Sequence, residues 1–139
     1  MKKLYETKVT VTGGREGKGK SSDGKLEVSL GLPAELGGSK TGTATNPEQL
    51  FGAGYAACFE SALRFVARNQ KIQITDSSVT ATISLSAKPE GGFQLGAALA
   101  VSLPGLDRSV AEKLIEAAHQ TCPYSNAIRG NVDVAIQLN

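Results

Sequence analysis

Asn46-Pro-Glu-Gln-Leu-Phe-Gly-Ala-Gly-Tyr-Ala-Ala-Cys-Phe-Glu-Ser-Ala-Leu-Arg-Phe-Val-Ala-Arg-Asn-Gln70 is the stretch that decides the fold, because it predicts one long helix. Asn46 can cap the helix, and Pro47 suits the first helical position because its missing N–H would have been unpaired there. Glu48 follows where the helix dipole favours an anion. From Leu50 to Ala67 the run is apolar almost all round, so we expect the helix to be mostly buried.

Cys58 lies in the middle of this predicted helix, one turn after the small residues Gly52, Ala53 and Gly54, which would let another element approach closely. A buried cysteine is by default a small hydrophobic residue. A reactive one needs help to form a thiolate, and Cys58 is too far from the helix start for the dipole to supply it. A reactive Cys58 therefore requires a cation from elsewhere in the chain, and Glu48 could hold an arginine for it.

Composition predicts a single cytoplasmic domain spanning residues 1–139. The chain is 40% hydrophobic and 20% charged, which is ordinary for a globular domain with a real core. A formal charge of +2 and the absence of tryptophan argue against nucleic acid as a partner. The start of the chain lacks the apolar core of a signal peptide, and the Leu50–Ala67 run is too rich in small and charged residues for a membrane span. Two cysteines in a reducing compartment are not a structural disulfide framework.

Alternating apolar and polar residues predict strands on both sides of the helix. These strands cover Leu4–Thr12, Lys25–Leu30, Ser78–Lys88, Phe93–Leu103 and Val132–Leu138, and the third and fourth form a hairpin. A second helix is predicted from a capping box at Ser109 and Glu112 up to Pro123, directly after Cys122. The order β-β-α-β-β-α-β predicts an α+β fold in which two principal helices pack on antiparallel strands.

The connection Gly13–Gly24 contains a pattern that invites a wrong assignment. Gly14 to Ser21 match the phosphate-loop sequence GxxxxGK[ST] letter by letter. A phosphate loop works because its lysine and serine open a helix, whereas here Ser22-Asp-Gly24 turns at once into a strand. We interpret the segment as a flexible, basic connection, and Arg15 within it is a candidate for the cation that Cys58 needs.

Three motifs give the chain a specific resemblance. They are Asn46–Phe51, Gly54–Phe59 and Ala118–Asn126, supported by Gly13–Arg15 and Ser21–Gly24. Together they resemble the organic hydroperoxide resistance proteins, within the broader OsmC-like group that includes the osmotically inducible peroxidases. Gly52, Glu60 and Ile128 differ from the residues expected there, but none occupies a chemical position.

The resemblance implies a role for four residues. Cys58 would be the peroxidatic thiol and Cys122 the resolving thiol, joined as a disulfide during turnover. Arg15 would activate Cys58, and Glu48 would hold Arg15, although the resemblance leaves open whether Arg15 acts on its own subunit's Cys58 or on the partner's. It also implies an OsmC-like fold, an intertwined homodimer with active sites at the subunit interface, and reduction by a dithiol on a lipoylated protein. No metal and no tightly bound cofactor are implied.

An apolar lining is the expected basis of substrate choice. Leu50, Phe51, Tyr55 and Phe59 lie on the same predicted helix as Cys58. Such a lining would favour alkyl or lipid hydroperoxides over hydrogen peroxide. The resemblance implies a function in defence against oxidative stress, as a thiol-dependent peroxidase.

Three other functions stay open at this point. His119 and Cys122, three residues apart, could bind zinc together with Cys58, which purified protein carrying stoichiometric metal would support. His119 could instead activate Cys122 in a cysteine hydrolase. Finally, both thiols could simply pack in the core of a binding protein, in which case they would react slowly with peroxide and never join.

Overall fold

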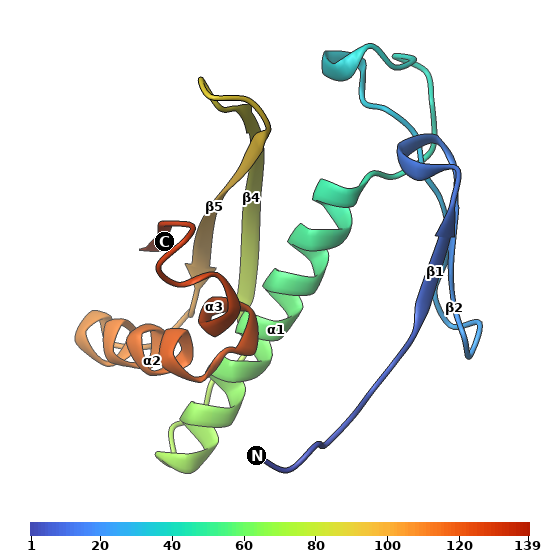
Figure 1. Ribbon diagram of the computed structural model, residues 1–139. Coiled ribbons are helices and arrows are strands. Elements are labelled where there is room, and N and C mark those ends of the chain that lie inside the picture. The colour runs from blue at the N-terminus through green and yellow to red at the C-terminus, as the bar shows by residue number, and fades with distance from the viewer. The chain divides into compact units, whose positions relative to one another are not determined.

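The computed structural model describes all residues from Met1 to Asn139 and confirms the α+β class (Figure 1). The chain divides into two compact units, Met1–Leu50 and Phe51–Asn139, which are described in turn. A single domain over residues 1–139 stays a prediction.

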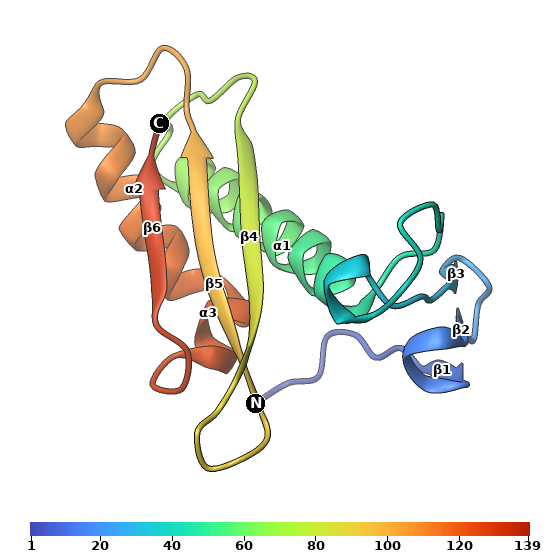
Figure 2. The same cartoon turned by 90° about the horizontal axis from the view of Figure 1, so that it is seen from above.

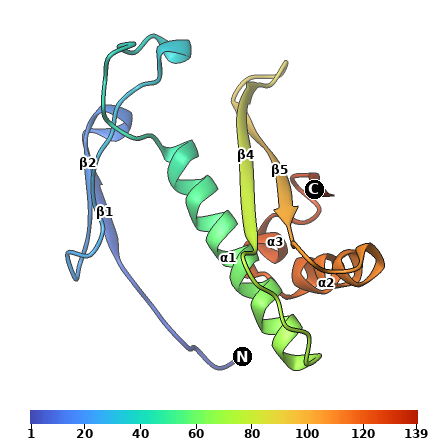
Figure 3. The same ribbon diagram turned by 180° about the vertical axis from the view of Figure 1, so that it is seen from behind.

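The first unit contains a three-stranded antiparallel sheet. Its strands are β1 (Val9–Thr12), β2 (Lys18–Ser21) and β3 (Glu27–Ser29), with β2 in the centre. Figure 3 shows β1 and β2 side by side. The central strand corrects the prediction of a flexible connection at Gly13–Gly24. Its sequence, Lys-Gly-Lys-Ser, has no apolar alternation to reveal it. Gly19 is buried opposite Val11 and Val28, whose methyl groups would lie 3.3 and 3.4 Å from an added Cβ.

The same strand explains why the phosphate-loop pattern has no phosphate-loop structure. Lys20 and Ser21 are in β2, and Ser21 is its last residue. The hydroxyl of Ser21 donates a hydrogen bond of 2.7 Å to the carboxylate of Asp23. No helix begins at these residues, so the rejection of a phosphate loop from sequence is confirmed.

The long helix α1 spans Pro47–Asn69, as the sequence predicts. The side-chain oxygen of Asn46 accepts a hydrogen bond from the backbone N–H of Gln49 at 2.8 Å, which confirms the expected cap. At the other end Lys71 takes a left-handed conformation with φ of 57° and lets the chain turn away.

The second unit is built on a sheet of β4 (Ser78–Ala87), β5 (Phe93–Ser102) and β6 (Val134–Leu138), with β5 in the centre (Figure 2). β4 and β5 form the predicted antiparallel hairpin, with Ala81 opposite Leu99. β6 runs parallel to β5, whereas antiparallel pairing was expected. The chain between β5 and β6 passes through two helices and returns to the end of the sheet at which β5 begins. Such a crossover connection produces a parallel pair.

The crossover consists of α2 (Arg108–Thr121) and the short α3 (Pro123–Ile128). Asp107 caps α2 by accepting a hydrogen bond from the N–H of Ser109 at 3.1 Å, so the predicted capping box starting at Ser109 is wrong. An aspartate two residues earlier already satisfies that N–H. Pro123 ends α2 as predicted and then serves as the first residue of α3.

The core of the second unit lies between the sheet and the helices. α1 and α2 cover the same face of the sheet (Figure 2). The largest side chains with essentially no exposed surface are Tyr55, Phe59, Leu63, Leu99, Val101, Leu114, Cys122 and Ser125. A Cβ on Gly52 would lie 3.3 Å from Ile83, which confirms that small residues in α1 let a neighbouring element come close. None of the helices has the length and apolar character needed to span a membrane.

Candidate active site

Both cysteines of the chain are free thiols in the second unit, and they are neighbours there. Cys58 is half-buried in the middle of α1, and Cys122 is fully buried at the corner between α2 and α3. The thiol of Cys122 lies close enough to raise the pKa of Cys58. The fold therefore brings together two thiols that are far apart in the sequence, and only Cys58 is accessible from outside.

Pro123 fixes the position of Cys122. The residue before a proline is pushed out of the helical region, and Cys122 has extended backbone angles of −65° and 120°. Its N–H still donates to the carbonyl of Ala118 at 2.8 Å, and its carbonyl accepts from Asn126 at 3.0 Å. The backbone of Cys122 thus forms the last hydrogen bond of α2 and the first hydrogen bond of α3.

The surroundings of Cys58 within this unit oppose thiolate formation. Burial raises the pKa of its thiol, and the neighbouring Cys122 raises it further. The backbone N–H of Tyr124 lowers the pKa of Cys58, but this effect is smaller than that of burial. A reactive Cys58 therefore requires a cation from elsewhere, for which Arg15 is the candidate.

In the first unit, Arg15 and Glu48 form a two-bond ion pair. The two terminal guanidinium nitrogens of Arg15 donate to the two carboxylate oxygens of Glu48 at 2.9 and 2.7 Å. The hydrogen bonds to Arg15 lower the pKa of Glu48, and Glu48 in turn raises the pKa of Arg15. The carboxylate uses only part of the guanidinium, which carries five N–H donors, so Arg15 retains donors for another anion.

A tight glycine turn presents Arg15. Residues Gly14–Glu16 form a single 3-10 turn between β1 and β2, and Gly13 before it has a left-handed φ of 79°. A Cβ on Gly17 would clash with the carbonyl oxygen of Thr12, so only glycine fits there. Glu48 is placed equally firmly because it lies in the first turn of α1, next to the Asn46 cap.

An aromatic cluster adjoins Cys58 on α1. Tyr55 stacks on Tyr124 with ring centroids 5.9 Å apart, and Phe51 meets both rings at 6.0 and 6.1 Å. Gly54 permits this packing, because a Cβ there would lie 2.7 Å from the Tyr124 hydroxyl. Gly54 thereby allows the segment that contains Cys122 and Tyr124 to come close to α1.

The four residues expected to line a substrate pocket differ in exposure. Tyr55 and Phe59 have no exposed surface and belong to the core. Phe51 is half-buried and lines a cavity of about 250 Å³, and Leu50 is half-buried at the end of the first unit. The other residues lining that cavity are Phe93, Gln94, Leu95, Ala97, Ile128, Asn131 and Val132. Contact of these four residues with substrate stays a prediction.

Sequence reasoning gave Ser125 no role, but the structure places it in the centre of a buried hydrogen-bond chain. Ser125 is fully buried, and its hydroxyl lies 2.8 Å from the hydroxyl of Tyr55 and 2.9 Å from Nδ1 of His119. No group of three or more His, Cys, Asp and Glu side chains is arranged to hold a metal ion. The cues for Ser125 in the sequence are its place in the motif Ala118–Asn126 and its spacing of three residues from Cys122.

Comparison with known proteins places this site in a family. The family model described as OsmC-like protein matches residues 37–137. The chain belongs to the OsmC-like protein family. It is 46% identical over 99% of its length, and over 96% of the relative's length, to a protein of Xanthomonas axonopodis pv. citri named organic hydroperoxide resistance protein. Within the family the chain groups with proteins of that name.

Solved structures of this family have the same fold. An organic hydroperoxide resistance protein from Legionella pneumophila is 55% identical, with a TM-score of 0.94 and 99% of each chain covered. A protein from Vibrio cholerae, described as a putative organic hydroperoxide resistance protein with captopril in one of its active sites, is 47% identical with a TM-score of 0.95. That match covers 100% of this chain and 94% of the other. The resemblance found in the sequence is thereby confirmed at the level of family and fold.

Proposed function

We propose that this protein is a cysteine-based peroxidase that reduces organic hydroperoxides to alcohols and so takes part in defence against oxidative stress. The observation that carries the proposal is the pair of neighbouring free thiols, one accessible and one buried. The names of the relatives support hydroperoxides as the substrate class.

In the first step the Cys58 thiolate attacks the terminal oxygen of the hydroperoxide. The O–O bond breaks, Cys58 is oxidised to a sulfenic acid, and the alkoxide takes up a proton and leaves as the alcohol. The exposure of the two thiols supports this assignment, because Cys122 has no surface that a peroxide could reach.

In the second step Cys122 attacks the sulfenic sulfur. A Cys58–Cys122 disulfide forms, the S–O bond breaks, and the hydroxide leaves with the thiol proton as water. An external dithiol then reduces the disulfide and is itself oxidised. A lipoyl group on a partner protein fits this last step, because it can close its own ring after giving up two electrons.

Arg15 is the proposed activating cation, and Glu48 its positioning partner. A carboxylate beside a thiolate would raise the thiol pKa, so Glu48 acts by holding Arg15 in place. The unused guanidinium donors would stabilise both the Cys58 thiolate and the negative charge that develops on the leaving oxygen.

Arg15→Gln removes the charge while keeping a hydrogen-bonding side chain of related length. We expect the pKa of Cys58 to rise by at least about one unit, since the backbone N–H of Tyr124 is then left to oppose the larger effect of burial. We also expect the first oxidation at pH 7 to slow by roughly a hundredfold. The measurements are thiolate absorbance against pH and stopped-flow oxidation by cumene hydroperoxide.

Lys18→Gln is the matched control, because it removes a cation from the same segment that forms no ion pair with Glu48. Its thiol pKa and oxidation rate should equal those of the wild type. If Arg15→Gln behaved like this control, Arg15 would have no activating role.

Substrate preference provides the direct test of the proposed function. Wild-type protein should consume cumene hydroperoxide in the presence of dihydrolipoamide much faster than it consumes hydrogen peroxide, because Tyr124, whose backbone N–H contacts Cys58, packs with Phe51 and Tyr55 into an aromatic cluster. Equal rates with the two peroxides would contradict selectivity for organic substrates. If neither peroxide were consumed, the proposed function would be contradicted.

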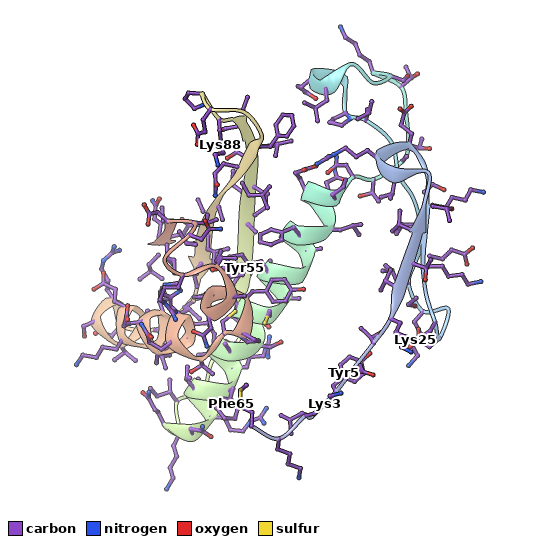
Figure 4. The ribbon with its side chains drawn as sticks, in the orientation of Figure 1. Lys3, Tyr5, Lys25, Tyr55, Phe65 and Lys88 are labelled. Atoms are coloured by element: carbon purple, nitrogen blue, oxygen red, sulfur yellow. The ribbon has the colours of Figure 1, made fainter.

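An intertwined homodimer is part of the proposal. The first unit leaves large apolar side chains exposed, among them Leu4, Tyr5, Val9 and Val11 (Figure 4 labels Tyr5). A second copy of the chain could bury this surface. Light scattering should then give twice the 14.4 kDa mass of one chain, and a monomer would contradict the dimer.

A further inference from the structure

The hydroxyl groups of Tyr55 and Ser125 form a hydrogen-bonded pair next to the pair of cysteines. Tyr55 precedes Cys58 by three residues on α1, and Ser125 follows Cys122 by three residues in α3. Residues three apart in a helix lie on the same side, one turn from each other. The hydrogen bond of 2.8 Å between the Tyr55 and Ser125 hydroxyls therefore connects the same two segments as the cysteine pair, one turn away.

This second connection is buried and held from both sides. Tyr55 and Ser125 have no exposed surface, so water does not compete for their hydroxyls. Tyr55, labelled in Figure 4, extends from α1 toward α3. His119 in α2 contacts the Ser125 hydroxyl through Nδ1 at 2.9 Å. Ser125 thus ties α1, α2 and α3 together at one point.

Besides the hydroxyl pair, the segment that carries Cys122 is linked to α1 through the backbone N–H of Tyr124, which contacts Cys58. Pro123 breaks the helix there, so Cys122 lies between two helices that do not form one continuous rod. Burial raises the pKa of Tyr55, and the two nearby cysteines add a smaller effect in the same direction, which agrees with a position of its hydroxyl near both sulfurs. The hydroxyl pair is well placed to control how far Cys122 lies from Cys58.

We propose that Tyr55 and Ser125, with His119 as the anchor of Ser125, are positioning residues that keep Cys122 facing Cys58 for disulfide formation. The proposal rests on the Cys58–Cys122 disulfide of the proposed function. The bond between the two hydroxyls survives while the sulfurs change their chemistry, so the segments stay aligned when Cys58 becomes a sulfenic acid. Rapid closure matters because a sulfenic acid that waits is oxidised further to an irreversible sulfinic acid.

Tyr55→Phe tests this with the smallest change. It removes one hydroxyl and keeps the ring that packs on Phe51 and Tyr124, while Ser125 keeps its bond to His119. We expect the effective concentration of Cys122 toward Cys58, measured by titrating the disulfide with dithiothreitol, to fall about tenfold. Mass spectrometry in excess hydroperoxide should also show a larger sulfinic fraction.

Ser21→Ala provides the matched control for Ser125→Ala. Ser21 is also buried, and its hydroxyl bonds to Asp23 at 2.7 Å, but it lies in the sheet of the first unit. Both variants should lose stability in denaturant, and only Ser125→Ala should lower the effective concentration. If Tyr55→Phe and Ser125→Ala both kept it within about twofold of the wild type while losing stability, the hydroxyls would be merely structural.

The dithiothreitol titration separates this proposal from the peroxidase function. It needs no peroxide, because diamide can form the disulfide in the wild type. A wild type that forms the disulfide but consumes no hydroperoxide would end the proposed function and leave the positioning test intact. A wild type that cannot form the disulfide would end both.

Discussion

Replacing Cys58 by serine is expected to reduce hydroperoxide consumption to the rate measured without protein. The hydroxyl of serine does not ionise near neutral pH, so no nucleophile remains to attack the peroxide. Cys122 cannot take over, because it is fully buried and faces Cys58. The measurement is consumption of cumene hydroperoxide with dihydrolipoamide as the reductant.

The control for Cys58→Ser is a measurement that the variant is still folded. Serine is close in size to cysteine, and Cys58 is only half-buried, so the circular dichroism and unfolding midpoint should stay near those of the wild type. A Cys58→Ser protein that is folded and fully active would refute the assignment of the peroxidatic thiol.

Replacing Cys122 by serine is expected to permit one oxidation and then stop turnover with dithiols at low concentration. Cys58 still reacts, but the sulfenic acid has no partner thiol, so its mass rises by about 16 Da and it can be trapped by dimedone. Rapid quench should show consumption of one equivalent of hydroperoxide per chain followed by a plateau.

This plateau would distinguish the role of the resolving Cys122 from that of the peroxidatic Cys58. With repeated additions of hydroperoxide, Cys122→Ser should accumulate sulfinic acid and lose activity permanently, whereas the wild type should recover with dithiol. Steady turnover of Cys122→Ser at the wild-type rate would show that the external reductant attacks the sulfenic acid directly and that Cys122 is not required.

The parts of the fold with strong local signals were predictable from the sequence. Asn46 and Pro47 marked the start of α1, and the cap is where they placed it. The β4–β5 hairpin was visible because both strands alternate apolar and polar residues over their whole length.

The parts that depend on contacts between different elements are not predictable from the sequence pattern. β2 is a strand because Gly19 fits between Val11 and Val28, and a lone glycine between lysines carries no strand signal. The parallel direction of β6 depends on the path of α2 and α3, which periodicity does not describe.

The candidate site divides in the same way. From residue types alone, Cys58 and Cys122 could be either structural or reactive cysteines. Their pairing as a disulfide is implied only by the motif resemblance. The structure adds that the two thiols are neighbours and that Arg15 is bound to Glu48. The role of Ser125 is not predictable from the sequence, because its partners Tyr55 and His119 lie on other helices.

The most direct test of the disulfide mechanism is to add one equivalent of an alkyl hydroperoxide to reduced wild-type protein and follow free thiols and intact mass within seconds. The mechanism predicts rapid loss of both thiols and a mass drop of about 2 Da, the signature of a Cys58–Cys122 disulfide. Oxidation no faster than that of a free thiol in solution, with both thiols remaining, would contradict it.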